Sequence, residues 1–129
     1  MKKILVVDDE PSLTRLIKAN LERTGRYVVR TENQGAKAIE AARQFRPDLI
    51  FLDVMMPDMS GGDIAAALQE DLQLCNIPHV FLTAIVTHDE TVPTGSQIGG
   101  HLFLAKPVKT EELIATIEKV LEQINGVKR

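Results

Sequence analysis

Short apolar runs alternate with helical patterns along the chain. The runs contain mostly branched and aromatic residues and no charged ones, which is typical of strands buried on both faces of a parallel sheet. They cover residues 4–7, 27–29, 49–52, 80–82 and 102–105. Arg26 and Arg30 flank the second run, and this polarity predicts that it forms an edge strand.

Apolar residues at helical spacing follow the first three runs and the last one. The first helix is expected to begin near Pro11 and to stop at Gly25, and the second to cover residues 33–45 before Pro47. The apolar positions that define the four helices are Leu13, Leu16, Ile17 and Leu21; Ala36, Ile39, Ala42 and Phe45; Ile64, Leu68 and Leu72; and Leu113, Ile114, Ile117, Val120, Leu121 and Ile124.

The segment between the fourth and fifth runs interrupts this alternation. A crossover helix is expected there, but Pro93, Gly95, Gly99 and Gly100 all oppose one. We therefore expect a short or irregular fourth helix within residues 87–100, with weak hydrogen-exchange protection.

Strand–helix units in this order predict one doubly wound α/β domain over residues 1–129, with a five-stranded parallel sheet in a (βα)5 flavodoxin-like arrangement. The last helix is expected to have Thr110 as its N-cap and to stop at Gly126. In such a sheet the functional site lies at the carboxyl ends of the strands.

The composition of the chain mainly excludes certain classes of protein. The 129 residues, 44% hydrophobic and 26% charged, match an ordinary folded domain. A net charge of −3 gives no basic footprint, so direct nucleic-acid binding is not expected. Membrane association is not expected either, because no apolar run reaches the roughly 18–20 residues of a membrane span. Cys75 is the single cysteine, which excludes an internal disulfide and favours a cytoplasmic location.

Polar residues follow four of the five predicted strands. They are Asp8, Asp9 and Glu10 after the first strand, Asp53 after the third, Thr83 after the fourth and Lys106 after the fifth. Because the carboxyl ends of parallel strands meet at one edge of a sheet, these side chains are expected to share a small volume.

This group of residues has the parts for phosphoryl transfer. Clustered carboxylates repel one another, and a hard cation with oxygen ligands, Mg²⁺, relieves that repulsion and also binds phosphate oxygens. Lys106 adds positive charge and Thr83 a hydroxyl donor. Asp53 is the favoured nucleophile, since it stands alone among apolar neighbours and can form an acyl phosphate. Of Asp8 and Asp9, one can ligate the metal directly and the other through water.

The chain resembles the receiver domain of bacterial two-component response regulators over residues 3–123. The motifs that carry the resemblance are Asp8-Asp9-Glu10, Leu52-Asp53-Val54-Met55-Met56-Pro57 with Gly61, Thr83-Ala84 and Lys106-Pro107. They occur in this order, each at a predicted strand end.

The resemblance implies that Asp53 accepts a phosphoryl group from a histidine kinase or a histidine phosphotransfer protein. It implies that Asp9 ligates Mg²⁺ directly, that Asp8 assists, and that the main-chain carbonyl of Met55 completes the protein ligands. Such a protein is not an enzyme acting on other substrates, because it catalyses only its own Mg²⁺-dependent phosphorylation and dephosphorylation.

The resemblance also implies a switch. Thr83 and Lys106 contact the phosphoryl oxygens, Phe103 is the aromatic residue that turns inward on activation, and the Lys106–Pro107 peptide bond is cis. The outer surface of the fifth strand then changes shape and controls an unidentified output protein, either in another molecule or in a part of the protein beyond this chain. A phosphorylation-dependent homodimer is a further partner in the family, although the irregular fourth crossover departs from the usual dimer face.

Two other functional classes are alternatives for this sequence. A Mg²⁺-dependent phosphatase with an aspartate nucleophile needs an Asp-X-Asp pair after the first strand, whereas this chain has Asp8-Asp9-Glu10 there. A flavodoxin-like redox carrier needs a phosphate-binding loop at the same place, where these acids would repel the FMN phosphate. Yellow colour of the purified protein would favour the second class.

Overall fold

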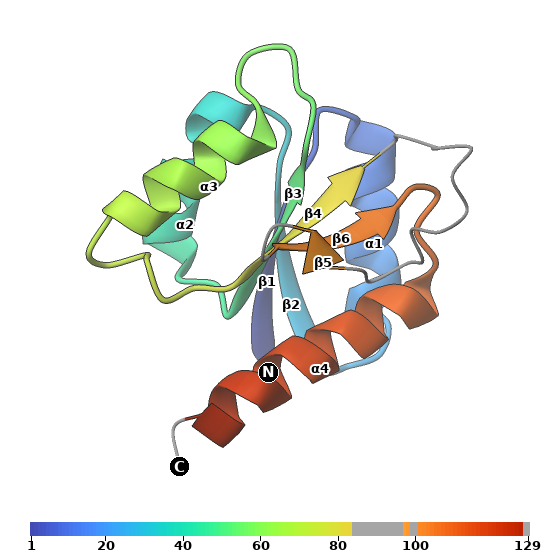
Figure 1. Cartoon of the computed structure of the whole chain (residues 1–129). Helices are drawn as coiled ribbons and strands as arrows, with labels where there is room; N and C mark the ends of the chain where they lie inside the picture. Colours follow the sequence, from blue (N-terminus) through green and yellow to red (C-terminus); the bar gives the residue numbers. More distant parts are fainter. Residues whose placement is uncertain (84–96, 99–100, 128–129) are drawn as a thin grey trace.

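The computed structural model describes residues 1–83, 97–98 and 101–127 (Figure 1). Its sheet has the strand order β2-β1-β3-β4-β6-β5. The parallel strands are β1 (Lys2–Val7), β2 (Tyr27–Glu32), β3 (Leu49–Asp53), β4 (His79–Thr83) and β6 (His101–Ala105). The predicted five-stranded parallel sheet is thus confirmed, with β2 at one edge, and the short β5 (Gln97–Ile98) adds an antiparallel strand at the other.

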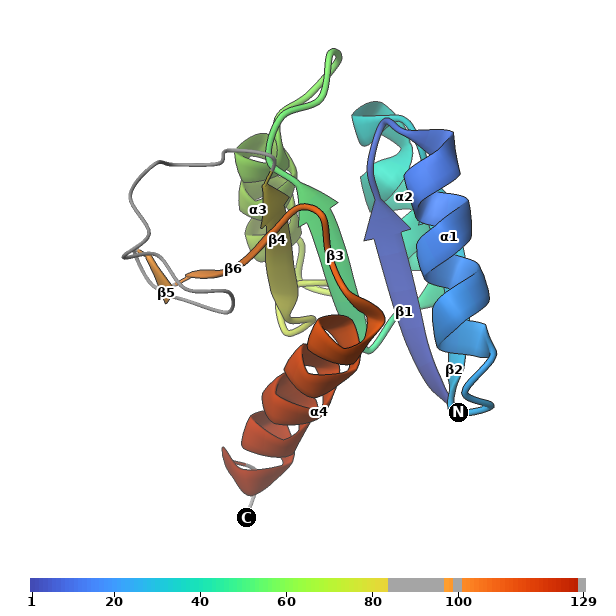
Figure 2. The ribbon, with the colours of Figure 1, turned by 90° about the vertical axis from the view of Figure 1, so that its right-hand side faces the viewer.

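Helices cover both faces of this sheet (Figure 2). On one face lie α1 (Pro11–Glu22) and α4 (Thr110–Val127). On the other lie α2 (Ala38–Phe45), which the 3₁₀ turn η1 (Gly35–Lys37) precedes, and α3 (Gly61–Glu70).

The alternation of side chains along β1 explains why there are two cores. Ile4 and Val6 pack against α1 and α4, whereas Leu5 and Val7 pack against α2 and α3. All four side chains are completely buried. The continuous apolar run of β1 therefore reflects burial on both faces, as expected for a central parallel strand.

Two leucines predicted to lie on buried helix faces are exposed. Leu16 is 57% exposed because it lies about 100° around α1 from its buried neighbour Ile17. Leu72 is 93% exposed because α3 ends at Glu70 and its C-cap, Asp71, is already extended.

The second helix also departs from its prediction. Residues 33–34 precede the helical part, Gly35–Lys37 forms the 3₁₀ turn, and Ala36 is exposed. The predicted helix ends near Gly25 and before Pro47 are confirmed: Gly25 has a φ of 76°, and Arg46 is the left-handed C-cap of α2 with a φ of 53°.

Both predicted ends of the last helix are wrong. Thr110 is the first helical residue rather than the N-cap. The main-chain N–H of Lys109, just before it, donates to the Glu112 carboxylate at 3.2 Å, and this bond satisfies a donor at the helix start. The helix continues through Gly126 to Val127, since one helical glycine costs only about 1 kcal/mol.

The prediction of a short or irregular fourth helix covers residues 87–100. Of these, Gln97–Ile98 form the strand β5, and residues 87–96 and 99–100 lie outside the described residues. Pro93, Gly95, Gly99 and Gly100 are among them. None of the helices in the described ranges has a stretch apolar enough, over sufficient length, to cross a membrane.

Candidate functional site

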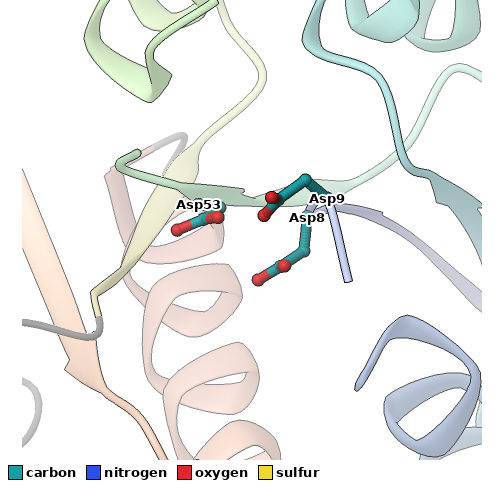
Figure 3. Close-up of side chains that lie close together, drawn as sticks. All are labelled: Asp8, Asp9 and Asp53. Carbon is teal, nitrogen blue, oxygen red and sulfur yellow. The ribbon is translucent and has the colours of Figure 1, made fainter. Parts of the chain in front are cut away.

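Three carboxylates meet where β1 and β3 end (Figure 3). The two strands are neighbours, with Val7 paired to Leu52, so the next residues, Asp8 and Asp53, lie side by side. Asp8, Asp9 and Asp53 each offer one oxygen atom, and these atoms lie within 4.8 Å of one another. The sequence-based expectation that the acids at the strand ends share one small volume is therefore confirmed.

Asp8 is the most buried member of the group, with no exposed surface. Its Oδ1 accepts a hydrogen bond from the main-chain N–H of Glu10 at 3.0 Å, which holds the carboxylate at the entrance to α1. Its Oδ2 lies 2.6 Å from Nζ of Lys106 and has no other partner among the described residues. A buried carboxylate oxygen with spare acceptor capacity is suited to a cation.

Lys106 brings the positive charge of the site from β6. Its Nζ lies 2.6 Å from Asp8 Oδ2, 3.5 Å from Asp53 Oδ1 and 3.8 Å from Glu10 Oε1. Burial acts to lower the pKa of Lys106, but the hydrogen bond and charge of Asp8, with the charges of Asp53 and Glu10, outweigh burial and raise the pKa. The side chain is therefore a permanent cation, and the Lys106–Pro107 peptide bond is cis, as expected.

Asp53 is 4% exposed. Burial and then the charge of Asp8 raise its pKa to about 6, against the opposing influence of Lys106. The main-chain N–H of Met55 donates to Oδ1 at 3.4 Å. Three acids thus face one close lysine, and a divalent cation would relieve the remaining repulsion.

A surface pocket of about 350 Å³ opens over these side chains, lined among others by Asp9, Glu10, Asp53, Met55, Thr83 and Lys106. It brings together the predicted acceptor, the predicted phosphate-contacting residues and Met55. The side chain of Met55 is 70% exposed. Ligation by its carbonyl, and the roles of Thr83 and Lys106, stay predictions.

Phe103 lies on β6 and packs against Phe81 of β4. The ring centroids are 5.2 Å apart with a 30° angle between the ring planes. Phe103 is partly buried against the core between the sheet and α2 and α3. Its role as a switch stays a prediction, and this contact shows where its ring lies.

The donor set fits Mg²⁺. All candidate ligands are oxygen atoms, two of the three acids are buried, and Asp8 Oδ2 retains acceptor capacity. A site with few carboxylates and room for water and phosphate oxygens is the arrangement that Mg²⁺ favours.

Two residues that support the site carry no motif signal. Asn33, expected inside a helix, instead bonds the main chain of Asp8, and Asp58, expected only in a turn, bonds the main chain at the start of η1. Both contacts join segments far apart in sequence, so no local pattern reveals them.

Comparisons with known proteins give one consistent result. The sequence profile of the response regulator receiver domain matches residues 4–118. Protein PilH of Pseudomonas aeruginosa is 35% identical over 121 residues, which are 94% of this chain and 98% of PilH. The PhoP protein of Bacillus subtilis, a regulator of alkaline phosphatase synthesis, is 38% identical over 95% of this chain and 49% of its own length.

Solved structures agree with the sequence comparisons. The chemotaxis protein CheY4 of Vibrio cholerae superposes with a TM-score of 0.78 at 32% identity, covering 93% of this chain and 98% of that one. The chain spans about half the length of several curated relatives, among them RpaA of Synechocystis at 52% and PhoP at 49%.

Proposed function

Because this chain belongs to the response regulator receiver domain family, whose members act in two-component signalling by phosphorylation-dependent switching, we propose that it accepts a phosphoryl group on Asp53. One observation carries the proposal: the oxygens of Asp8, Asp9 and Asp53 lie within 4.8 Å of one another, with Nζ of Lys106 3.5 Å from Asp53 Oδ1. This arrangement combines a nucleophile, a metal site and a cation in one pocket.

In the proposed reaction a carboxylate oxygen of Asp53 attacks the phosphorus atom. The bond between phosphorus and the donor atom, the imidazole nitrogen of a phosphohistidine, breaks, and the donor keeps the electron pair. The product is an acyl phosphate on Asp53 and a free histidine on the kinase or phosphotransfer protein. The chain itself catalyses only this transfer and the later hydrolysis.

The surrounding residues hold the reacting groups. Asp8, Asp9, Asp53 and the Met55 carbonyl would hold Mg²⁺, which would supply charge neutralisation between the acids and the phosphoryl oxygens. The Lys106 ammonium, already close to Asp53, and the Thr83 hydroxyl donate to those oxygens. Above about pH 6 Asp53 is ionised and available as the nucleophile.

The proposed switch links this pocket to β6. Phosphorylation adds roughly −1.5 to −2 charge and new acceptor oxygens. Thr83 moves to bind them, and Phe103, already in contact with Phe81, turns further inward. The outer surface of β6 changes shape, and a partner that prefers the new surface stabilises it. The output is a protein contact, made with another molecule, with a second copy of this chain or with a part of the protein beyond this chain. The chain itself is not expected to bind nucleic acid or a membrane directly, and we place the protein in the cytoplasm.

The test is incubation with acetyl phosphate and Mg²⁺, followed by intact-mass measurement. The expected result is a gain of about 80 Da, the mass of one phosphoryl group, that is lost in Asp53→Asn. Asp63→Asn, which alters an exposed aspartate at the start of α3, is the matched control and should keep the gain. A folded protein without the gain, or a gain retained in Asp53→Asn, contradicts the proposal.

A further inference from the structure

A short segment after β2 contacts both loops that carry the acidic residues. The side-chain amide of Asn33 donates to the main-chain carbonyl of Asp8 at 2.8 Å and to the Thr14 hydroxyl at 3.0 Å. Thr14 is buried in α1, and its hydroxyl donates to the Pro11 carbonyl at 3.1 Å. Asn33 therefore joins the end of β1 to the first turn of α1.

The other end of the segment is held by the loop after β3. The Asp58 carboxylate accepts hydrogen bonds from the main-chain N–H groups of Gly35 at 3.2 Å and Ala36 at 3.0 Å. A side chain at Gly35 would bring its Cβ within 2.9 Å of Cβ of Met59, so the two loops are closely packed here. The start of η1 is thereby tied to the loop that follows Asp53.

These contacts act on the site through its main chain. The Asp8 carbonyl belongs to the peptide unit between Asp8 and Asp9, so holding this group orients both acids. Asp58 lies five residues after Asp53 in the loop that also contains Met55. The segment from Asn33 to Ala36 is thus bonded on both sides of the group of acids, although none of these acids belongs to it.

We propose that this segment, residues 33–36, is a brace that sets the separation between the Asp8–Asp9 pair and the Asp53 loop, and so determines the Mg²⁺ affinity of the site. The proposal rests on the proposed function in taking Mg²⁺ as the ion. Asn33 and Asp58 are positioning residues, because they act on the metal site through main-chain groups of other residues.

The test is a calorimetric titration of the unphosphorylated protein with Mg²⁺ alone. Asn33→Ala and Asp58→Ala should each weaken Mg²⁺ binding about fivefold, the effect of roughly one net hydrogen bond. The rate of phosphorylation by acetyl phosphate at saturating Mg²⁺ should change less than about twofold, because the reacting groups remain present. A general loss of structure would lower both the Mg²⁺ affinity and the phosphorylation rate at saturating Mg²⁺, whereas loss of the brace should lower only the affinity.

Control variants distinguish an effect on the metal site from the general effect of losing a side-chain to main-chain hydrogen bond in a loop. Asp71→Ala is the control, because Asp71 also accepts a main-chain N–H in a loop, from Gln73 at 2.8 Å, but lies after α3. It should leave Mg²⁺ affinity unchanged. Thr14→Ser keeps the hydroxyl and should bind Mg²⁺ as the parent does, whereas Thr14→Val should weaken binding.

The brace is contradicted when Asn33→Ala and Asp58→Ala bind Mg²⁺ as the parent does, or when Asp71→Ala weakens binding equally. If urea titration shows no cooperative unfolding transition for Asn33→Ala, that variant is not folded. Mg²⁺ binding by Asp58→Ala and by the two Thr14 variants then tests the proposal. A parent protein that binds Mg²⁺ but gains no phosphoryl group contradicts the proposed function, and the Mg²⁺ titrations of the variants still test the brace. A parent that binds no Mg²⁺ overturns the brace.

Discussion

Nζ of Lys106 lies closer to Asp8 than to the proposed acceptor: 2.6 Å from Asp8 Oδ2 against 3.5 Å from Asp53 Oδ1. The lysine thus compensates the most buried carboxylate of the site. In the proposed reaction its ammonium turns from this carboxylate toward the phosphoryl oxygens on Asp53.

Loss of this lysine should make stability depend on Mg²⁺. Lys106→Ala leaves Asp8 buried without its cation, so the free energy of unfolding without Mg²⁺ should fall by about 2–4 kcal/mol. Mg²⁺ should restore much of the loss by binding the folded state. Urea titrations with and without Mg²⁺ measure both effects. Lys109→Ala, an exposed lysine nearby, should change stability by less than about 0.5 kcal/mol, and equal behaviour of the two variants contradicts the prediction.

Asp53 should make the metal-free protein less stable as pH rises. Its pKa is about 6 in the folded chain, whereas an aspartate in an unfolded chain has an ordinary pKa of 3.8, so between these pH values the folded state binds more protons than the unfolded state. The contribution of Asp53 to the free energy of unfolding therefore falls between pH 4 and pH 6 and stays low above pH 6.

The matching variant is Asp53→Asn, which removes this titration. Without Mg²⁺ it should be more stable than the parent at pH 7.5, by on the order of 1–3 kcal/mol, and nearly equal to it at about pH 4. Urea titrations at both pH values check this result. A stability difference that is the same at both would show that the gain does not come from the Asp53 charge.

Gly61 should be required for space rather than for backbone freedom. A Cβ there would overlap the Asp53 carbonyl oxygen and lie 3.1 Å from Cα of Val54. Gly61→Ala should therefore destabilise the fold by about 1–3 kcal/mol and slow phosphorylation by moving Asp53. Gly62→Ala, whose Cβ would come no closer than 3.8 Å to the Ser60 hydroxyl, should cost almost nothing. Similar losses in the two variants would refute this explanation.

The free edge of β2 is covered by side chains of α1. Lys18 donates to the Val29 carbonyl at 2.7 Å, and Glu22 accepts from the Val29 N–H at 3.0 Å. The hydrogen bond from this N–H is the main cause that holds the pKa of Glu22 below its usual value. Lys18 lowers the pKa further, and burial opposes both effects. Both main-chain groups of Val29 are therefore unavailable to another chain.

Removal of this cover should promote association. The double variant Lys18→Ala, Glu22→Ala should lose about 1–2 kcal/mol of stability and aggregate faster on mild heating, followed by light scattering. Glu40→Ala with Gln44→Ala removes a pair at the same spacing on α2, in which the Gln44 amide donates to the Glu40 carboxylate at 3.3 Å. This control should remain in solution, and aggregation of both double variants to the same extent would contradict the prediction.

Much of the fold was predictable because burial on two faces leaves a clear pattern. The apolar runs of β1 and β3 predicted central strands, and the arginines around β2 predicted an edge. Helix limits were less predictable. Leu72 has the right spacing for α3 but lies beyond its end, and Gly126 did not end α4, because single residues shift helix ends by small energies.

The sequence by itself determined which chemistry meets at the strand ends. Asp8 and Lys106 directly follow a strand and Asp53 is the last residue of one, and parallel strands bring their carboxyl ends together whatever the details of packing. Only the tertiary structure decided which of the two acids Lys106 pairs with, and that Asn33 and Asp58 bond the site loops from outside. These contacts join residues distant in sequence across gaps of a few ångströms, and such distances are set by how the loops and helices pack rather than by any local pattern.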